Sequence, residues 1–124
     1  MRDTHRKKTI GDYGERLAAE FLLKKGYVIL VKNYRVRGGE IDLLAQQDDE
    51  LVIVEVKTRT SVQYGWPEEA VNYHKYQHLV TAAHRWLGEQ GSGLTLRQIR
   101  FDVIAIELDL MARTARFRHI KNIS

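Results

Sequence analysis

Residues 39–57, which read GEIDLLAQQDDELVIVEVK, predict a strand, a turn and a second strand. Two apolar runs, residues 41–45 and 51–56, flank the polar segment at residues 46–50, and this pattern is typical of a β-hairpin. Side chains of a strand alternate between its two faces, and both faces of the second strand are apolar until Glu55 and Lys57. An unpartnered buried charge costs several kcal/mol, so each of these two groups needs a partner.

Acidic residues also mark the first strand of this hairpin. By the same alternation Glu40 and Asp42 share one face, and Asp42, Glu55 and Lys57 can meet on one face of adjacent strands. Two carboxylates about 5 Å apart repel by roughly 3 kcal/mol at an effective dielectric near 20. A bound divalent cation reverses that repulsion, and oxygen-only ligands favour Mg²⁺ or Mn²⁺.

The order of these groups resembles the PD-(D/E)xK nuclease signature, in which an Asp on one strand precedes Glu-x-Lys on the next. Asp42 and the run Glu55-Val56-Lys57 stand at those positions, while Ile41 replaces the Pro, a loose feature of the superfamily.

Two further motifs narrow this resemblance. They are GDYGE at residues 11–15 and GGEIDL at residues 38–43. With them the chain is similar to the small YraN-like family of restriction-endonuclease-like proteins, which is similar in turn to the archaeal Holliday-junction resolvases. The resemblance runs from about residue 11 to about residue 106.

The elements expected along the chain have the order α-β-β-β-α-β-β, which gives an α/β fold with a mixed sheet of about five strands flanked by helices. This arrangement is similar to the restriction-endonuclease-like core of the family. The resemblance implies a metal-dependent DNA endonuclease, with branched recombination or repair intermediates as candidate substrates. Asp42, Glu55 and the carbonyl of Val56 would hold Mg²⁺ or Mn²⁺. Glu15 would complete the cluster or hold a second ion. Lys57 would orient the attacking water or neutralise charge on the phosphate.

Length and composition limit the class of protein. The 124 residues suffice for one domain with its own core but not for two, and the absence of cysteine excludes disulfides and thiolate metal sites. No apolar run is long enough to span a membrane, and the first residues lack the apolar core of a signal peptide. We therefore expect a soluble cytoplasmic protein.

Charge is distributed unevenly along the chain. Residues 1–39 carry ten Lys/Arg against four Asp/Glu (+6), residues 40–57 one against six (−5), and residues 58–124 nine against six (+3). An acidic pocket in a basic body suits a polyanion once cations fill the pocket, although a solvated charged surface explains the charges equally well. We expect DNA as the partner. RNA, a homodimer that cuts both strands, and a recombination or repair protein stay open.

Five residues outside the acidic stretch are predicted nucleic-acid contacts: Arg35, Arg37, Arg59, Trp66 and Lys75. The two arginines at 35 and 37 precede a glycine pair, and solvated strand-edge charges are the alternative for them. Trp66 lies in an irregular segment, where it would stack on exposed bases or pack back onto the domain. Lys75 lies at the edge of an apolar helix face and could reach the site as a second cation.

The helices are predicted from apolar periodicity and end signals. Residues 1–8 predict a flexible basic tail before a single domain at residues 9–124, with Thr9 as the N-cap of the first helix. A second helix is expected at about residues 72–89.

Two glycines interrupt the first predicted helix. Gly11 and Gly14 each cost about 1 kcal/mol relative to Ala inside a helix, which predicts the close approach of another segment. Glu15 lies at the border of the apolar stripe and can lean toward Asp42. An ordinary surface glutamate is the alternative reading of Glu15.

Three further strands complete the expected sheet. Residues 27–33 form the first strand, residues 99–107 a central strand and residues 113–120 an edge strand. Asp102 interrupts the central strand, and a salt bridge to Arg100 or another Arg is the simplest explanation, with assistance to the site as the alternative.

Two rival functions remain at this point. A binding module would keep the fold, and even the metal, without cutting its ligand. Hydrolysis of a small phosphate ester is the second rival, but the chain has no Gly-rich phosphate-binding loop.

Overall fold

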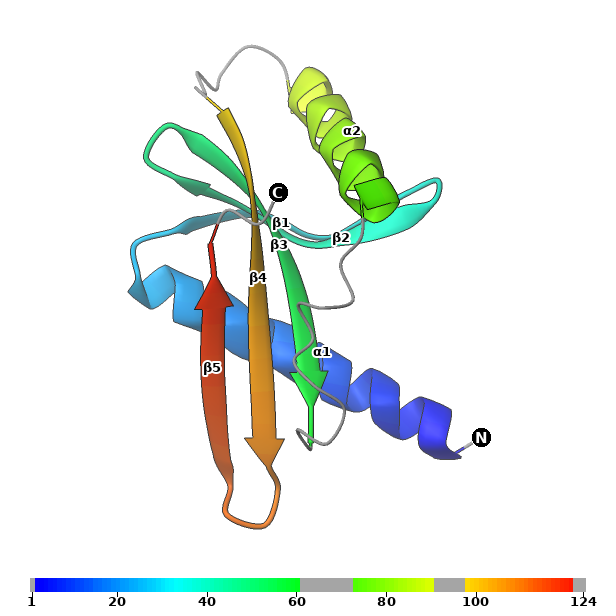
Figure 1. Ribbon diagram of the computed structural model, residues 1–124, viewed down its shortest axis with the longest axis vertical. Coiled ribbons are helices and arrows are strands. Elements are labelled where there is room, and N and C mark those ends of the chain that lie inside the picture. The colour runs from blue at the N-terminus through cyan, green and yellow to red at the C-terminus, as the bar shows by residue number, and fades with distance from the viewer. Residues whose placement is uncertain (1, 61–72, 91–97, 122–124) are drawn as a thin grey trace.

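A computed structural model shows a five-stranded mixed sheet with one helix on each face (Figure 1). It describes residues 2–60, 73–90 and 98–121. The elements are α1 (Arg2–Lys24), β1 (Val28–Val36), β2 (Gly39–Gln47), β3 (Glu50–Arg59), α2 (Tyr73–Gln90), β4 (Gln98–Asp109) and β5 (Thr114–Ile120). This order and the mixed sheet confirm the predicted fold class.

The strands lie in the sheet in the order in which they occur along the chain. β3 and β4 are parallel, and every other neighbouring pair is antiparallel. Parallel neighbours need a crossover connection, and α2 lies in the connection between β3 and β4. β5 is an edge strand, as predicted.

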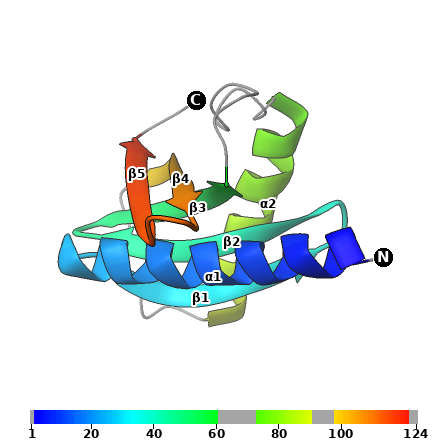
Figure 2. The same cartoon turned by 90° about the horizontal axis from the view of Figure 1, so that it is seen from below.

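Each face of the sheet has its own apolar core, because β3 is apolar on both sides. Val52, Val54 and Val56 pack on the side of α1, whereas Leu51 and Ile53 pack on the side of α2. Figure 2 shows α1 lying along one side of the sheet and α2 on the other. Neither described helix is long and apolar enough to cross a membrane.

The first helix begins earlier than the sequence predicts. Because α1 starts at Arg2, the prediction that Thr9 caps it was wrong. No Pro or Gly separates residues 2 and 9, so nothing in the sequence breaks the helix there. Mobility of residues 1–8 stays a prediction.

The first strand also continues farther than predicted. β1 passes through Asn33 and ends at Val36, and Asn33 adopts the left-handed conformation with φ 53°. Asn tolerates this conformation better than most residues, so the strand bends there without ending. Arg37 and Gly38 then form the turn, with Gly38 at φ 90°, and Gly39 is the first residue of β2.

Only one of the two helix glycines lies against another segment. A Cβ on Gly14 would come within 2.8 Å of the Thr58 Cβ and still closer to its Oγ1, whereas a Cβ on Gly11 would meet nothing within 4 Å. The predicted close approach is therefore confirmed at Gly14 and wrong at Gly11.

Candidate metal centre

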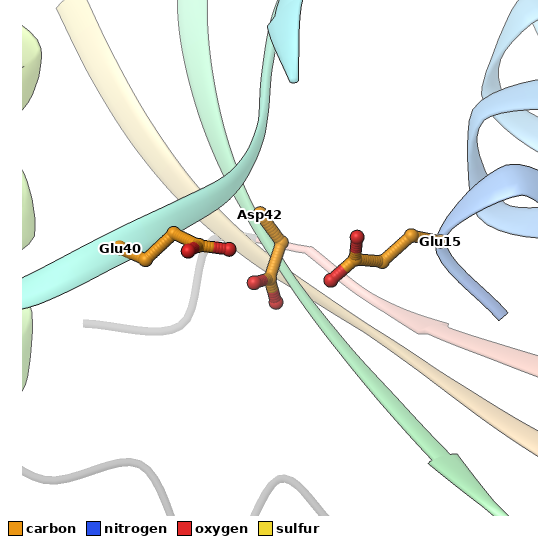
Figure 3. A group of neighbouring side chains, drawn as sticks. All are labelled: Glu15, Glu40 and Asp42. Atoms are coloured by element: carbon orange, nitrogen blue, oxygen red, sulfur yellow. The ribbon is translucent and has the colours of Figure 1, made fainter. Parts of the chain in front are cut away.

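Three carboxylates from α1 and β2 converge beside β3. Figure 3 shows Glu15 and Glu40 approaching Asp42 from opposite sides. One ligand oxygen from each lies within 4.8 Å of the other two, and all three residues are half-buried. Oxygen ligands on opposite sides of a magnesium ion, at about 2.1 Å from it, are about 4.2 Å apart. The three donors would have to move inward slightly to hold one Mg²⁺ or Mn²⁺ ion, and metal binding stays a prediction.

Asp42 lies where β2 separates from β3. The backbone register between these strands ends at Leu43 and Val54, so the N–H of Val56 has no β2 backbone partner in that register. The Val56 N–H instead donates a hydrogen bond of 2.8 Å to Asp42 Oδ2. A buried N–H needs an acceptor. This hydrogen bond holds one oxygen of Asp42 at the point where the backbone pairing of β2 with β3 ends.

The two faces of β2 exchange sides around Asp42, whereas the register shift between β1 and β2 lies farther along, between Ile29 and Val31. The register between β1 and β2 pairs Lys32 with Leu43 and Tyr34 with Ile41 but omits Asn33 and Asp42. On either side of this point, Ile41 packs in the core on the α2 side and Leu43 in the core on the α1 side. Simple alternation would place these two residues on one face, so the strand rotates around Asp42.

The site raises the pKa of Asp42 to about 7. Burial is the largest cause, followed by the charge of Glu55, while the Val56 N–H acts in the opposite direction and the charges of Glu15 and Glu40 raise the pKa further. Without a cation, Asp42 therefore keeps a proton through much of the acidic range.

The pKa of Glu15 is raised as well. Burial and then the charges of Glu40 and Asp12 raise it, while hydrogen bonds with Asn33 and Asp42 lower it. A hydrogen bond between the carboxyl groups of Glu15 and Asp42 requires a shared proton, which is the usual response of crowded carboxylates.

Asn33 contacts the carboxylates of both Glu15 and Glu40, and Arg35 contacts that of Glu40. With the Asn33 amide oriented so that its nitrogen faces the acids, that nitrogen donates to Glu15 Oε1 at 2.8 Å and to Glu40 Oε1 at 3.0 Å. Arg35 Nε lies 3.2 Å from Glu40 Oε2, although the Arg35 side chain is 86% exposed. Glu40 is therefore bound through both of its oxygens.

Glu55 lies outside this group of three and is paired with two lysines. Lys75 Nζ donates to Glu55 Oε1 at 3.0 Å, and Lys57 Nζ lies 3.5 Å from the same oxygen. The Glu55 residue is only 6% exposed, so both lysines compensate a buried charge. Lys75 comes from α2 and completes this pairing from a different element.

Comparison with known proteins gives the family. The profile described as "Uncharacterised protein family UPF0102" matches residues 14–106, which is most of the chain. The chain belongs to this family. A UPF0102 protein of Caldanaerobacter subterraneus is 46% identical over 94% of both chains. A UPF0102 protein of Alkaliphilus oremlandii is 44% identical over 93% of this chain and 97% of its own length.

The UPF0102 match confirms the YraN-like resemblance and spans all four predicted catalytic residues. Glu15 and Asp42 lie together, as expected, whereas Glu55 and Lys57 form a neighbouring pair with Lys75. Val56 contributes its N–H to Asp42, and a metal contact from its carbonyl stays a prediction.

The remaining predicted contacts of this UPF0102 protein are dispersed. Arg35 is paired with Glu40, and Arg37 is exposed in the turn between β1 and β2. Arg59 is the last residue of β3 and half-buried, while Trp66 lies outside the described residues. Their roles with nucleic acid stay predictions.

The sequence alone did not assign Glu40 or Asn33 to the site. Glu40 could have been found, because it shares the Asp42 face of one strand. Asn33 gave a weaker signal, since an Asn is depleted in strand interiors and suggests an irregularity there. Its contacts with the acids depend on α1 and β2 together.

Proposed function

We propose that this UPF0102 protein is a metal-dependent nuclease that hydrolyses phosphodiester bonds in DNA. The convergence of Glu15, Glu40 and Asp42 is the observation that carries this proposal. The adjoining cluster of one buried carboxylate and two lysines supports it, because metal-assisted phosphodiester hydrolysis uses both a cation site and groups that stabilise a phosphate.

The carboxylates of Glu15, Glu40 and Asp42 would hold one Mg²⁺ or Mn²⁺ ion. A bound ion supplies positive charge to the phosphate and lowers the pKa of its bound water. Asp42 must lose its proton to become an anionic ligand, and its raised pKa makes this loss depend on pH near neutrality.

The lysines would act on the substrate from the adjoining cluster. Lys57 is about one-third exposed, so its ammonium group can contact a phosphate while it still balances Glu55. There it would orient the attacking water or neutralise charge that develops on the phosphate. Lys75 is similarly exposed and would supply a second positive charge. Glu55 keeps the two ammonium groups beside the metal ligands.

DNA is the proposed substrate because of charge and the family resemblance. The net charge is +4 although residues 39–57 are strongly acidic. The excess of Lys and Arg therefore lies in the sequence before and after this stretch. Arg35 near the end of β1 and Arg37 in the turn that leads into β2 are both exposed and would contact phosphates.

A nuclease assay on several DNA structures tests the proposal. Purified protein is incubated with linear, single-stranded, flapped and four-way DNA in Mg²⁺, in Mn²⁺ and in EDTA. We expect metal-dependent cutting of at least one substrate, lost in EDTA and lowered about 100-fold or more by Lys57→Ala. Gly11→Ala, purified in the same way, is the control for a contaminating nuclease.

The rival function is a nucleic-acid-binding module without catalysis. Lys57→Ala and the unmodified protein would then bind DNA, and neither would cut any substrate in either metal. That result would contradict the nuclease proposal and favour the binding module.

A further inference from the structure

Asn33 is unusual because its left-handed backbone lies inside a strand. Among the described residues other than glycine, three have positive φ: Asn33, Asp48 and Arg113. Asp48 and Arg113 lie in turns, where this conformation is common, whereas Asn33 is in the middle of β1. A left-handed residue is unfavourable unless surrounding contacts maintain it.

The contacts that maintain it are with metal-ligand candidates. The Asn33 amide nitrogen donates at 2.8 Å to Glu15 Oε1 and at 3.0 Å to Glu40 Oε1. A side-chain amide has two N–H groups, so one Asn can satisfy both carboxylates. The two acids come from α1 and β2, and Asn33 therefore connects the two elements at the site.

We propose that Asn33 is a positioning residue that holds Glu15 and Glu40 at the separation a divalent cation needs. This inference rests on the proposed function, because it assigns a role within the same metal centre. The positive φ directs the amide toward both acids, and the interrupted pairing opposite Asp42 leaves the third carboxylate beside them.

The Asn33 amide carries no net charge, and this matters for positioning Glu15 and Glu40. A Lys or Arg could also bridge the acids, but its positive charge would compete with the cation for the oxygens that the amide contacts, as exposed Arg35 does at the other oxygen of Glu40. The amide lessens the repulsion between Glu15 and Glu40 and leaves their negative charge available. The site is thereby partly preorganised before a cation binds.

The Asn33→Gly variant distinguishes the effect of the side-chain amide from the effect of the backbone conformation. Glycine adopts positive φ without strain, so this variant keeps the bend in β1 and removes only the donor. Asp48→Gly is the matched control, since it makes the same kind of replacement at φ 53° in the turn between β2 and β3. Both proteins are titrated with Mn²⁺ by calorimetry and by electron paramagnetic resonance.

We expect Asn33→Gly to weaken Mn²⁺ binding about 10-fold or more, as is typical for loss of a group that orients metal ligands. Asp48→Gly should bind as the unmodified protein does. A merely structural role would predict a loss of stability with unchanged affinity, so urea unfolding without metal is measured on the same samples.

A double-mutant cycle tests whether Asn33 acts through Glu40. Glu40→Gln removes the charge that the amide holds, so Asn33→Gly should weaken Mn²⁺ binding by a smaller factor in that background. Equal factors in both backgrounds would contradict action through Glu40, and the inference as stated would be wrong.

The outcomes separate this inference from the proposed function. Mn²⁺ binding that Asn33→Gly leaves unchanged overturns the inference alone. Absence of Mn²⁺ binding by the unmodified protein overturns both. Weaker binding by Asn33→Gly, in a protein that cuts no DNA, supports the inference and contradicts the proposed nuclease.

Discussion

Gly14 of α1 lies directly against Thr58 of β3, and the space between them does not admit a Cβ. A Cβ on Gly14 would come within 2.8 Å of the Thr58 Cβ. Glu15 is the next residue along the helix, so this contact fixes how near one candidate metal ligand lies to the sheet. The geometry of the proposed centre therefore depends on a residue that contributes no ligand.

Gly14→Ala should move α1 away from β3 and lower metal affinity. Overpacking of this kind typically costs about 1–3 kcal/mol, whereas the gain in helix propensity is at most about 1 kcal/mol. The cost therefore equals or exceeds the gain. We expect a net loss of stability in urea unfolding and weaker Mn²⁺ binding, because Glu15 is displaced from Asp42.

Gly11→Ala is the matched control within the same helix. Its Cβ would meet nothing within 4 Å, so only the gain in helix propensity applies, up to about 1 kcal/mol. A Gly14→Ala protein as stable and as metal-competent as Gly11→Ala would refute the structural role of the contact.

The metal-free protein should lose stability as the pH rises from about 4 to about 7. The pKa of Asp42 is raised from 3.8 in the unfolded chain to about 7 in the folded one, mainly by burial. The folded state therefore binds more protons in this range, and its advantage over the unfolded state falls as pH increases. The raised pKa of Glu15 acts in the same direction.

Asp42→Asn should flatten this pH dependence, because an amide does not titrate. The shift of about three pKa units sets an upper limit of about 4 kcal/mol for the change between pH 4 and pH 8. Urea unfolding in EDTA across this range measures it. Parallel pH profiles for the variant and the unmodified protein would show that Asp42 is not the responsible group.

The fold could be predicted from the sequence because its signals are local. The apolar run that forms β3 and the alternation of Glu55 with Val54 and Val56 fix the faces of that strand. A salt bridge between Asp102 and Arg100, the simplest account of an acid in a central strand, is present.

The candidate site could be predicted only in part, because its geometry depends on long-range contacts. Alternation places Ile41 and Leu43 on one face, but they pack on opposite faces, and the left-handed Asn33 of β1 lies opposite the residue between them. The left-handed conformation of Asn33 depends on hydrogen bonds to two other elements, which no local pattern reveals. Long-range contacts also decide that Glu40 lies in the group with Asp42 and that Glu55 is paired with two lysines.

Removing both lysines that face Glu55 should destabilise the protein. Lys57→Ala combined with Lys75→Ala leaves a 6% exposed carboxylate without these two partners, and breaking buried ion pairs in this way typically costs about 3–5 kcal/mol. Addition of Glu55→Gln should restore much of the stability, because it removes the uncompensated charge. Urea unfolding measures all three proteins, and failure of this rescue would contradict the pairing.

Asp102→Ala should destabilise the protein strongly without weakening Mn²⁺ binding. Arg100 donates to both Asp102 oxygens, from Nε at 2.9 Å and from Nη2 at 3.0 Å, and Asp102 is fully buried. His119 Nε2 lies 2.8 Å from Asp102 Oδ2, so the carboxylate holds together β4 and β5. Its removal takes two charge-assisted hydrogen bonds from a largely buried guanidinium, which keeps Glu50 as an acidic partner at 2.9 Å, and we expect a cost of about 1.5–3 kcal/mol.

Arg116→Ala is the matched control for this prediction. Its guanidinium lies 3.4 Å from Glu107 and is 74% exposed, so its loss should change stability by at most about 1 kcal/mol. Urea unfolding compares the stability of the two variants. Calorimetry at low temperature in buffer without urea measures Mn²⁺ binding while Asp102→Ala is still folded. Asp102 lies outside the group formed by Glu15, Glu40 and Asp42, so we expect it to have no ligand role in the proposed centre. Mn²⁺ affinity that falls in the folded Asp102→Ala protein would instead place this residue in the metal site.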